Sequence, residues 1–353
     1  MTFPAGGSPL LERMLQVRQA MNARDAAILN RLLRDYLASY NNLKASILAL
    51  QEAVEAAGPG SLARLAALQS LLDGVKREIA RFAEILAENI EQAIQLEIEM
   101  AGIDTLALTQ AMLPGLETAR LMADWARLDK RTVYNLYGFL DPDGPLFAMI
   151  RNQFADDVAR MVRQQLLSGF VEGMHSNEIA RIMAKALGVG LDWALTMART
   201  AVIWSYRVST HQMYLANSKY IKGWYWISAL DRRTCMSCIA LHGSFHSLAE
   251  IQNDHHRGRC FSVPDTVSYA DLGLVGIEEF QPHIPAGEEW FKKQTDALQR
   301  EMMGPAKWKA WQDGAFEFDQ LTKTYTNPIY GPMKREATLH EILGDKANIY
   351  YGK

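Results

Sequence analysis

The chain has 353 residues, of which 49% are hydrophobic and 22% charged, enough to bury cores in two or three structural units. Its formal net charge of −3 excludes a nucleic-acid coat that binds by overall attraction, so any DNA contact would need a local patch. The amino terminus has neither the basic start nor the apolar run of a signal peptide, and no later segment offers about 18 uninterrupted apolar residues. We therefore expect a protein that is made in the cytoplasm and has no membrane partner.

Two long helices are predicted at the amino-terminal end. Residues 9–57 repeat apolar side chains every seven positions, and the helix breaker Gly58-Pro59-Gly60 ends the pattern. Ser61 can cap a second helix, whose coiled-coil seam includes the polar Asn89, a residue that can fix register or oligomeric state. The seam positions are Leu65, Leu72, Ile79, Leu86 and Ala93 on one side and Leu68, Val75, Phe82, Asn89 and Leu96 on the other.

The charges of these helices favour an antiparallel coiled-coil hairpin. From Arg13 to Lys44 the first helix has six basic and two acidic residues, whereas glutamates from Glu84 to Glu99 end the second. A short break between long helices favours antiparallel packing, and this fold lays the basic segment beside the acidic one. A solvated face explains any single charge equally well, since an exposed pair contributes on the order of 0–1 kcal/mol. Whether the helices pair within one chain or in a homo-oligomer stays open.

The middle of the chain is predicted to be helical. A strong turn, Asp141-Pro142-Asp143-Gly144-Pro145, is expected to separate it from the amino-terminal helices. Beyond this turn the amphipathic pattern predicts helices at about 146–170, 177–187 and 191–217, the last two separated by Gly188-Val189-Gly190.

At Ile221 to Ile227 the composition becomes aromatic and β-branched, which is typical of a strand. A further helix is predicted at 286–303. We therefore expect a mainly α fold with a small α+β zinc-knuckle module near the carboxyl-terminal third. The expected parts are 1–140 with the coiled-coil hairpin and short helices, 141–220 with the helical middle region, and 221–353 with the zinc-binding module and a helical extension.

All three cysteines lie between Cys235 and Cys260, which suits a metal site better than a disulfide frame. Cys235 and Cys238 have the spacing at which a tight turn aims two thiolates at one tetrahedral ion. The segment from Asp254 to Cys260 then returns an imidazole and the last thiol. We expect a structural zinc ion, one per chain, because a closed set of four protein ligands leaves no position for water. The expected ligands are Cys235, Cys238, either His255 or His256, and Cys260.

Other interpretations of these residues are possible. The cysteines can be small buried hydrophobes beside a loop with histidines, although every cysteine and four of the eight histidines lie in one 26-residue window. A redox Cys-x-x-Cys pair would need a βαβ context, which is missing. His242 and His246 could belong to an open site, but Gly243-Ser244 between them spoils a helical pair. We expect them to be exposed histidines in a β-turn that connects two short strands.

Several of these motifs occur in an order that is typical of one protein family. The order is Ala198-Arg199-Thr200, Trp226, Asp231-Arg232-Arg233-Thr234-Cys235-x-x-Cys238, Leu241-His242-Gly243, His255 to Cys260, and Pro264. It resembles the phage head morphogenesis family, also called Mu F-like minor capsid proteins, over roughly residues 148–344. That family usually ends the knuckle with His-Pro-x-Cys-Arg-Cys, and here Gly258 stands where the first of those cysteines would be. The resemblance supports His255 as the matching imidazole, with His256 as the alternative.

The resemblance implies a low-copy minor head protein of the virion, synthesised in the host cytoplasm. It implies association with the portal protein during procapsid assembly and a role in DNA packaging or ejection. The major capsid or scaffold protein is a further candidate partner, and any DNA contact should be weak or local. No Gly-rich phosphate loop, nucleophile elbow or convincing carboxylate pair occurs, so we expect no enzyme and no catalytic residue.

Two other classes of protein would each explain part of this sequence. A zinc- or metal-dependent HNH-like nuclease is suggested by Asp254-His255-His256 near a Cys-x-x-Cys pair, but the run from Phe261 to Asp265 offers neither the following helix nor its ligand. A stand-alone coiled-coil adaptor would explain residues 9–100 and leave the later half of the chain without a role.

Overall fold

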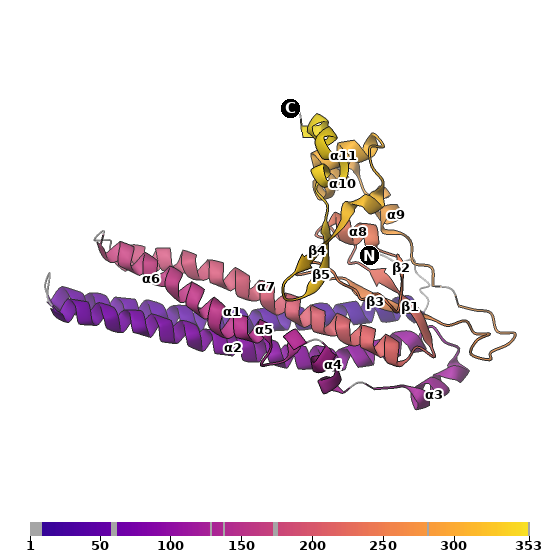
Figure 1. The fold of residues 1–353 in the computed structure, drawn as a ribbon, viewed down its shortest axis with the longest axis horizontal. Helices are drawn as coiled ribbons and strands as arrows, with labels where there is room; N and C mark the ends of the chain where they lie inside the picture. The colour runs from indigo at the N-terminus through magenta and orange to yellow at the C-terminus, as the bar shows by residue number, and fades with distance from the viewer. Residues whose placement is uncertain are drawn as a thin grey trace. The chain divides into compact units, whose positions relative to one another are not determined.

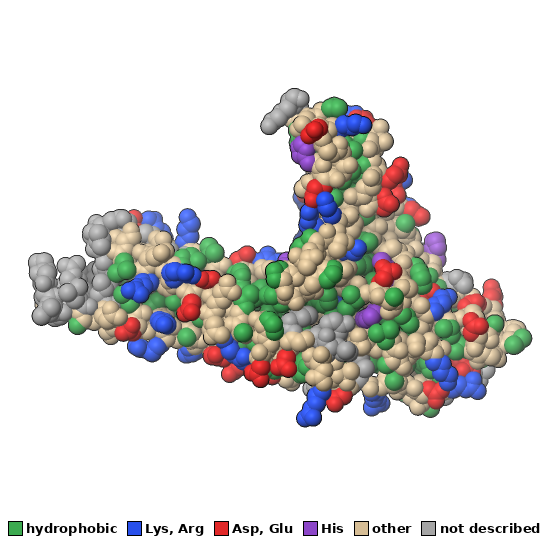
Figure 2. Space-filling model, in the orientation of Figure 1, with side chains coloured by type: hydrophobic (Ala, Val, Ile, Leu, Met, Phe, Trp, Pro, Cys, Tyr) green, Lys and Arg blue, Asp and Glu red, His purple; other side chains and the backbone are tan. Residues whose placement is uncertain are grey.

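The structure is a computed structural model that describes residues 9–57, 62–127, 129–136, 138–171, 176–280 and 282–351. Within these ranges the fold is mainly helical, as predicted, and the antiparallel strands lie in the carboxyl-terminal half (Figure 1). Among the helices described, none has the length and hydropathy that a membrane span requires. On the face drawn in Figure 2, basic and acidic side chains are interspersed.

The two long helices predicted at the amino-terminal end are present as α1 (Pro9–Ala57) and α2 (Leu62–Gln110), and α2 continues beyond the predicted seam. Side chains of the two helices pair in antiparallel order, because residues late in α1 contact residues early in α2. The pairs are Asn42 with Glu78, Ser39 with Arg81 and Arg31 with Asn89, each at 3.2 Å. The predicted turn at Gly58 to Gly60 and the predicted cap Ser61 lie outside the described residues.

Asn89, the polar residue of the predicted seam, is only 9% exposed and has partners for its side chain. Its amide donates to Asp35 at 3.0 Å, and its carbonyl oxygen accepts from Arg31 at 3.2 Å. These bonds offset the cost of burying an amide among apolar side chains. The apolar residues buried along this stretch of α1 and α2 include Leu32, Leu43, Ile47, Val75, Ile79, Phe82, Leu86 and Ile90.

The chain divides into two compact units that do not follow chain order. One unit comprises Met1–Met21, Glu97–Val133 and Ile203–Lys353, and the other comprises Asn22–Leu96 and Tyr134–Val202. Helices α1, α2 and α7 (Ser176–Ala216) therefore each contribute residues to both units. The shorter helices before the middle region are α3 (Gly115–Asp124), α4 (Lys130–Leu136) and the 3-10 helix η1 (Gly138–Leu140).

The helical middle region is confirmed, but the break predicted at Gly188-Val189-Gly190 is wrong, because α7 continues through it. Gly190 is buried, and a Cβ atom there would lie 3.0 Å from Cγ2 of Val158. Three residues along, Trp193 stacks on Phe154 with ring centroids 4.8 Å apart. The glycine therefore permits close helix packing rather than ending a helix. The helices before α7 are α5 (Pro145–Ala148), the π-helix η2 (Met149–Phe154) and α6 (Ala155–Val171).

The predicted strand is confirmed as β1 (Ile221–Ile227), the central strand of an antiparallel sheet of order β2-β1-β3. Its neighbours are β2 (Phe245–Ser247) and β3 (Phe261–Thr266). Trp224 of β1 pairs with His246 of β2 and with Pro264 of β3. The apolar cluster beside the sheet joins Ile227, Phe261 and Val263 to Tyr206 of α7, Leu10, Met14 and Val17 of α1, and Ala101, Leu108 and Met112 of α2.

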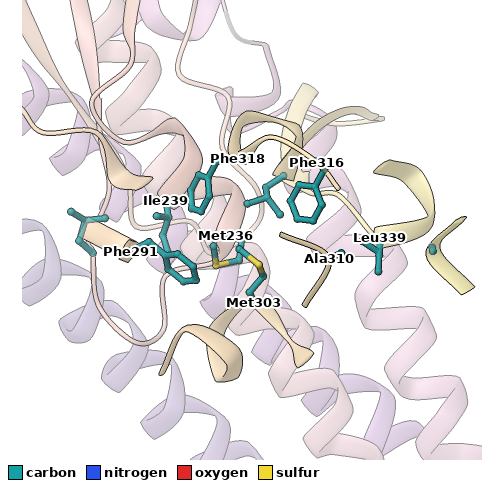
Figure 3. Packing of buried hydrophobic residues seen from close by; sticks show 11 residues of the cluster. Met236, Ile239, Phe291, Met303, Ala310, Phe316, Phe318 and Leu339 are labelled. Atoms are coloured by element: carbon teal, nitrogen blue, oxygen red, sulfur yellow. The ribbon is translucent and has the colours of Figure 1, made fainter. Parts of the chain in front are cut away.

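A second apolar cluster packs Met236 and Ile239 against helical segments that follow β3 in the chain (Figure 3). The helix predicted at 286–303 is in fact two helices, because Thr295 caps the second and accepts from the backbone N–H of Leu298 at 3.4 Å. Besides β2 and β3, the elements described after β1 are α8 (Met236–Leu241), α9 (Gly287–Lys292), α10 (Asp296–Met303), α11 (Pro305–Gln312), η3 (Phe318–Leu321), the antiparallel pair β4 (Thr322–Asn327) and β5 (Gly331–Glu336), α12 (Leu339–Leu343) and η4 (Gly344–Tyr351).

Candidate metal centre

The two cysteines of the Cys-x-x-Cys pair lie at the start of a short helix. Cys235 is the N-cap of α8, and its Sγ accepts from the backbone N–H of Cys238 at 3.4 Å. The prediction of a simple tight turn is therefore corrected to a helical first turn, which still brings both thiols to the same side. Before it, Thr234 donates from its backbone N–H to the Asp231 carbonyl at 2.9 Å, so the approach to the helix is a hydrogen-bonded turn.

The imidazole comes from the loop between β2 and β3. His255 Nδ1 lies 2.7 Å from the His256 carbonyl oxygen and donates to it, which leaves the lone pair of Nε2 available. That Nε2 is 3.2 Å from Sγ of Cys235 and 3.2 Å from Sγ of Cys238. A neutral histidine oriented by a carbonyl in this way has the arrangement of a metal ligand.

The third cysteine completes the donor cluster from the end of the same loop. Cys260 is 2% exposed, and its Sγ lies 3.4 Å from Oγ of Ser228. Its Sγ, that of Cys238 and a carboxylate oxygen of Asp254 all lie within 4.8 Å of one another. The donor atoms of Cys235, Cys238 and His255 meet the same limit. Cys238 belongs to both groups, so the two sets of possible donors share one thiol, and the second set adds Asp254, which the sequence did not predict.

His256, the alternative imidazole, faces another direction. Its Nε2 is 3.2 Å from Nδ2 of Asn327, and its ring lies edge-on to that of Tyr330 with centroids 5.7 Å apart. Both contacts are with the β4–β5 hairpin and its turn, so His256 is not part of the donor cluster.

The β-turn predicted after Leu241 is present, because the backbone N–H of Ser244 donates to the Leu241 carbonyl at 3.0 Å, but it connects α8 to β2 and its histidines are not exposed. His242 follows α8 and is 2% exposed, and its Nδ1 accepts from the backbone N–H of Ser228 at 2.9 Å. Burial, with a smaller effect from the charge of Arg18, lowers the pKa of His242 to about 4, so this histidine is neutral. His246 lies on β2 with its ring stacked on Trp224 at 4.3 Å. Both histidines therefore pack against residues of the β1 strand and the segment after it, and they are not among the donors of the cluster.

The cluster changes the protonation of its own members when no metal is bound. Hydrogen bonding from Cys238 and His255 lowers the pKa of Cys235 to about 5, against the opposing effect of burial. Burial lowers the pKa of His255, but the thiolate of Cys235 and the Asp254 carboxylate outweigh it and raise that pKa to about 10. The pKa of Cys238 is raised, because the neighbouring thiols Cys235 and Cys260 and burial disfavour a further thiolate. At neutral pH one thiolate therefore already exists for a cation to bind.

Arg207 of α7 holds the loop that supplies His255 and Cys260. Its guanidinium donates to Asp254 Oδ2 at 2.9 Å, to the Gly258 carbonyl at 3.0 Å, and to the Cys260 carbonyl at 2.8 and 3.0 Å. The side chains of Arg207 and Asp254 are each 1% exposed. The sequence analysis missed this arginine. Its signal was a basic residue inside a run of otherwise uncharged side chains from Ala201 to Thr210, all of them buried.

A second arginine ties the two halves of the cluster together. Arg259 donates to both carboxylate oxygens of Asp231, at 2.6 and 2.7 Å. These hydrogen bonds hold the pKa of Asp231 well below its usual range. Asp231 precedes the Cys-x-x-Cys pair and Arg259 precedes the last cysteine, so the ion pair joins the chain segments that carry the thiols.

Comparison with known proteins agrees with these features. Residues 160–264 match the model of the family described as Phage Mu protein F like protein. This segment is similar to the Mu F-like family. The resemblance predicted from the motifs is thereby confirmed over residues 160–264, a shorter segment than the 148–344 expected, and it indicates a structural protein of phage head morphogenesis. No curated protein and no solved structure matches the chain at a significant level.

The Mu F-like segment contains the whole donor cluster, from Cys235 to Cys260, and also Arg207. It also contains the glycine that departs from the family's usual knuckle. A Cβ atom at Gly258 would lie 2.1 Å from Asp254 Oδ2 and 2.9 Å from the His255 carbonyl oxygen. No side chain fits there while Arg207 holds the Asp254 carboxylate in place. A side chain at this position would therefore require the Asp254 carboxylate to move.

Proposed function

We propose that the protein is a minor head protein of a phage virion, associated with the portal, which acts in procapsid assembly and in DNA packaging or ejection. The observation that carries the proposal is the Mu F-like match over 160–264, which spans the complete donor cluster. The protein would be synthesised in the host cytoplasm and become part of the virion head.

The proposed metal is one structural Zn²⁺ per chain, held by Cys235, Cys238, His255 and Cys260. Zinc at about 2.3 Å from sulfur and about 2.0 Å from nitrogen requires its donors within about 4 Å of one another. The distances of 3.2 Å from His255 Nε2 to the sulfurs of Cys235 and Cys238 fit this requirement, and Cys260 shares a second donor group with Cys238. Soft thiolate donors favour zinc over magnesium or calcium. Bound there, zinc would join the start of α8 to the loop before β3.

We further propose that the protein is not an enzyme. Four protein ligands close a zinc site, whereas a catalytic site leaves a position for water. The HNH-like nuclease remains the alternative. It needs a helix with a second ligand directly after the knuckle. After Cys260 the chain enters β3, whose residues are all buried, and the next described helix begins at Gly287.

The helical parts are proposed to bind the portal, with the α1–α2 pair as an antiparallel coiled coil. Three large apolar side chains of α1, those of Leu33, Leu37 and Leu48, are 41%, 47% and 40% exposed. Their spacing of four and eleven positions places them on one face of the helix, an apolar stripe suited to a helical partner. The partner can be the portal, the major capsid or scaffold protein, or a second copy of this chain.

Co-expression with the cognate portal protein, followed by sedimentation, tests the proposed partner. We expect a shared complex, which a variant carrying Leu33→Glu and Leu37→Glu should lose. A matched variant with Arg34→Glu, a charged position beside the stripe, should keep the complex. Separate migration of the wild-type proteins under assembly conditions would contradict the portal association.

A DNA-cleavage assay with magnesium, manganese or zinc separates the two functions. We expect no cutting, and only weak DNA binding that fades as salt is raised, because the net charge is −3 and basic and acidic side chains are interspersed on the face shown in Figure 2. Metal-dependent cutting that disappears in His255→Ala would favour the nuclease.

A further inference from the structure

The two donor groups that share Cys238 contain five possible donors, although a structural zinc site takes four. The fifth is Asp254, which is fully buried. Its Oδ1 lies 3.3 Å from Sγ of Cys238 and 3.5 Å from Nε2 of His255. A carboxylate oxygen is itself a zinc ligand, so the surroundings of Asp254 decide whether it joins the ligand set.

Both oxygens of the Asp254 carboxylate already have partners. Oδ2 accepts from Nη2 of Arg207 at 2.9 Å, and Oδ1 accepts from the backbone N–H of His255 at 2.8 Å. Burial raises the pKa of Asp254, but the positive charge of Arg207 outweighs it and keeps that pKa below its ordinary value. Asp254 is therefore a carboxylate that is already bound to a cation.

Arg207 is well placed to keep that carboxylate fixed. Its guanidinium also donates to the carbonyls of Gly258 and Cys260, so its position is set by the loop itself. Three thiolates and one Zn²⁺ carry a net charge of −1, and an unpaired Asp254 would add another negative charge in a region closed to water. A buried charge without a partner is costly, and ligation of the metal is one way to remove that cost.

We propose that Arg207 is a positioning residue that keeps the Asp254 carboxylate out of the ligand set of the metal. The site then binds its ion through three sulfurs and one nitrogen. The inference rests on the proposed zinc centre and adds to it the residue that selects among five donors. When the charge of Arg207 is removed, the carboxylate turns to the metal and the coordination changes.

The test uses the full chain loaded with Co²⁺, whose visible absorption bands report coordination number and whose thiolate charge-transfer bands report bound sulfur. Wild type should show the intense bands of a four-coordinate ion with thiolate ligands. Arg207→Gln should weaken and shift these bands toward higher coordination, and zinc affinity measured against a chelator should fall about 10- to 100-fold. The double variant Arg207→Gln with Asp254→Asn should return to the four-coordinate pattern, because the intruding carboxylate is gone.

Two further variants serve as controls. Arg199 lies on the same helix and pairs with Asp25 at 2.8 Å, so Arg199→Gln should change neither the spectrum nor the affinity. Arg207→Lys keeps the positive charge and should keep the four-coordinate bands. Circular dichroism of each variant checks that the helices are retained.

A wild-type spectrum and affinity in folded Arg207→Gln would overturn the inference alone. Should that variant fail to fold, Asp254→Asn decides the question. An unchanged spectrum in Asp254→Asn supports the inference, because it shows that Asp254 does not bind the metal in the wild type. A changed coordination number shows that Asp254 is a ligand and overturns the inference. Absence of thiolate bands in wild type would instead overturn the zinc centre, and the role of Arg207 with it.

Discussion

The stretch of α1 and α2 between Asn22 and Leu96 and the donor cluster between Cys235 and Cys260 are held together by opposite means. In the helical pair, apolar side chains such as Leu32 and Leu86 are fully buried along a long seam, with few polar contacts between them. In the cluster, a few thiols, one imidazole and two ion pairs meet within a small volume. The helical pair should therefore lose stability gradually with each substitution, whereas the cluster should fail when one component is removed.

Metal removal is expected to have the largest effect. Structural zinc contributes about 10–16 kcal/mol of apparent binding free energy to small zinc domains at pH 7. Chelation, or Cys238→Ser, should therefore lower the melting temperature of the region around β1 and β3, and α1 and α2 should remain helical between Asn22 and Leu96 when that region has unfolded. Near-ultraviolet circular dichroism of the buried Trp224 and Trp226 should be lost, and far-ultraviolet helical signal should largely persist.

Elemental analysis should find about one zinc per chain in the wild type. Ser247→Ala, at an exposed residue of β2, is the matched control and should retain both the metal and the tryptophan signal. A protein with well under half an equivalent of metal after loading, or with unchanged content in Cys238→Ser, would show that the cluster is not a metal site.

A methyl group at Gly258 should have the next largest effect. The Cβ atom of Gly258→Ala would come within 2.1 Å of Asp254 Oδ2, which Arg207 holds in place. Forced displacement of a buried ion pair should cost about 1–3 kcal/mol and reduce metal affinity. Gly115→Ala is the control, because nothing lies within 4 Å of its Cβ position. Urea denaturation followed by tryptophan fluorescence measures both, and equal stability of the two variants would contradict the packing argument.

The two regions also differ in what their sequences could predict. Heptad spacing predicted α1 with the observed bounds, because a helix is specified by local periodicity. The donors Cys235, Cys238 and Cys260 could be predicted because soft ligands are rare and their clustering is informative. The β4–β5 hairpin was missed, since Thr-Lys-Thr-Tyr-Thr-Asn has no apolar alternation and its residues are only partly buried. Arg207 was missed because its partners lie 47 to 53 positions along the chain.

The metal-free cluster should show a pH dependence that the helical pair lacks. The pKa of Cys235 falls from 9.0 to about 5, so its contribution to stability is present above pH 9 and is lost as pH falls through about 5. The pKa of His255 rises from 6.5 to about 10, so its contribution is present below pH 6.5 and is lost as pH rises through about 10. The free energy of unfolding of the chelator-treated protein should therefore be highest between pH 6.5 and pH 9, and it should decline below and above these values.

Thermal unfolding of the metal-free chain between pH 4 and pH 11 measures this dependence. The comparison variant is His255→Gln, which removes the imidazolium partner of Cys235. Its melting temperature should vary less across the same range. A wild-type melting temperature that is independent of pH would show that the thiolate and the imidazolium are not paired.

The smallest expected effect lies in the helical region, at two glycines of α7 that differ in packing. Gly188→Ala meets nothing within 4 Å, so it should stabilise the protein by about 0.5–1 kcal/mol, the usual gain of alanine over glycine inside a helix. Gly190→Ala gains the same propensity, but its Cβ atom would lie 3.0 Å from Cγ2 of Val158 and 3.6 Å from Cε2 of Phe154. Because α6 must move away to relieve this contact, the net change should be a destabilisation of about 1 kcal/mol.

Urea unfolding followed by far-ultraviolet circular dichroism compares the two variants, and metal content should be unchanged in both. Stabilisation by both alanines would mean that Gly190 is not required for helix packing. Destabilisation by both would instead indicate that the helix has a break at this point, as the glycine pattern alone had predicted.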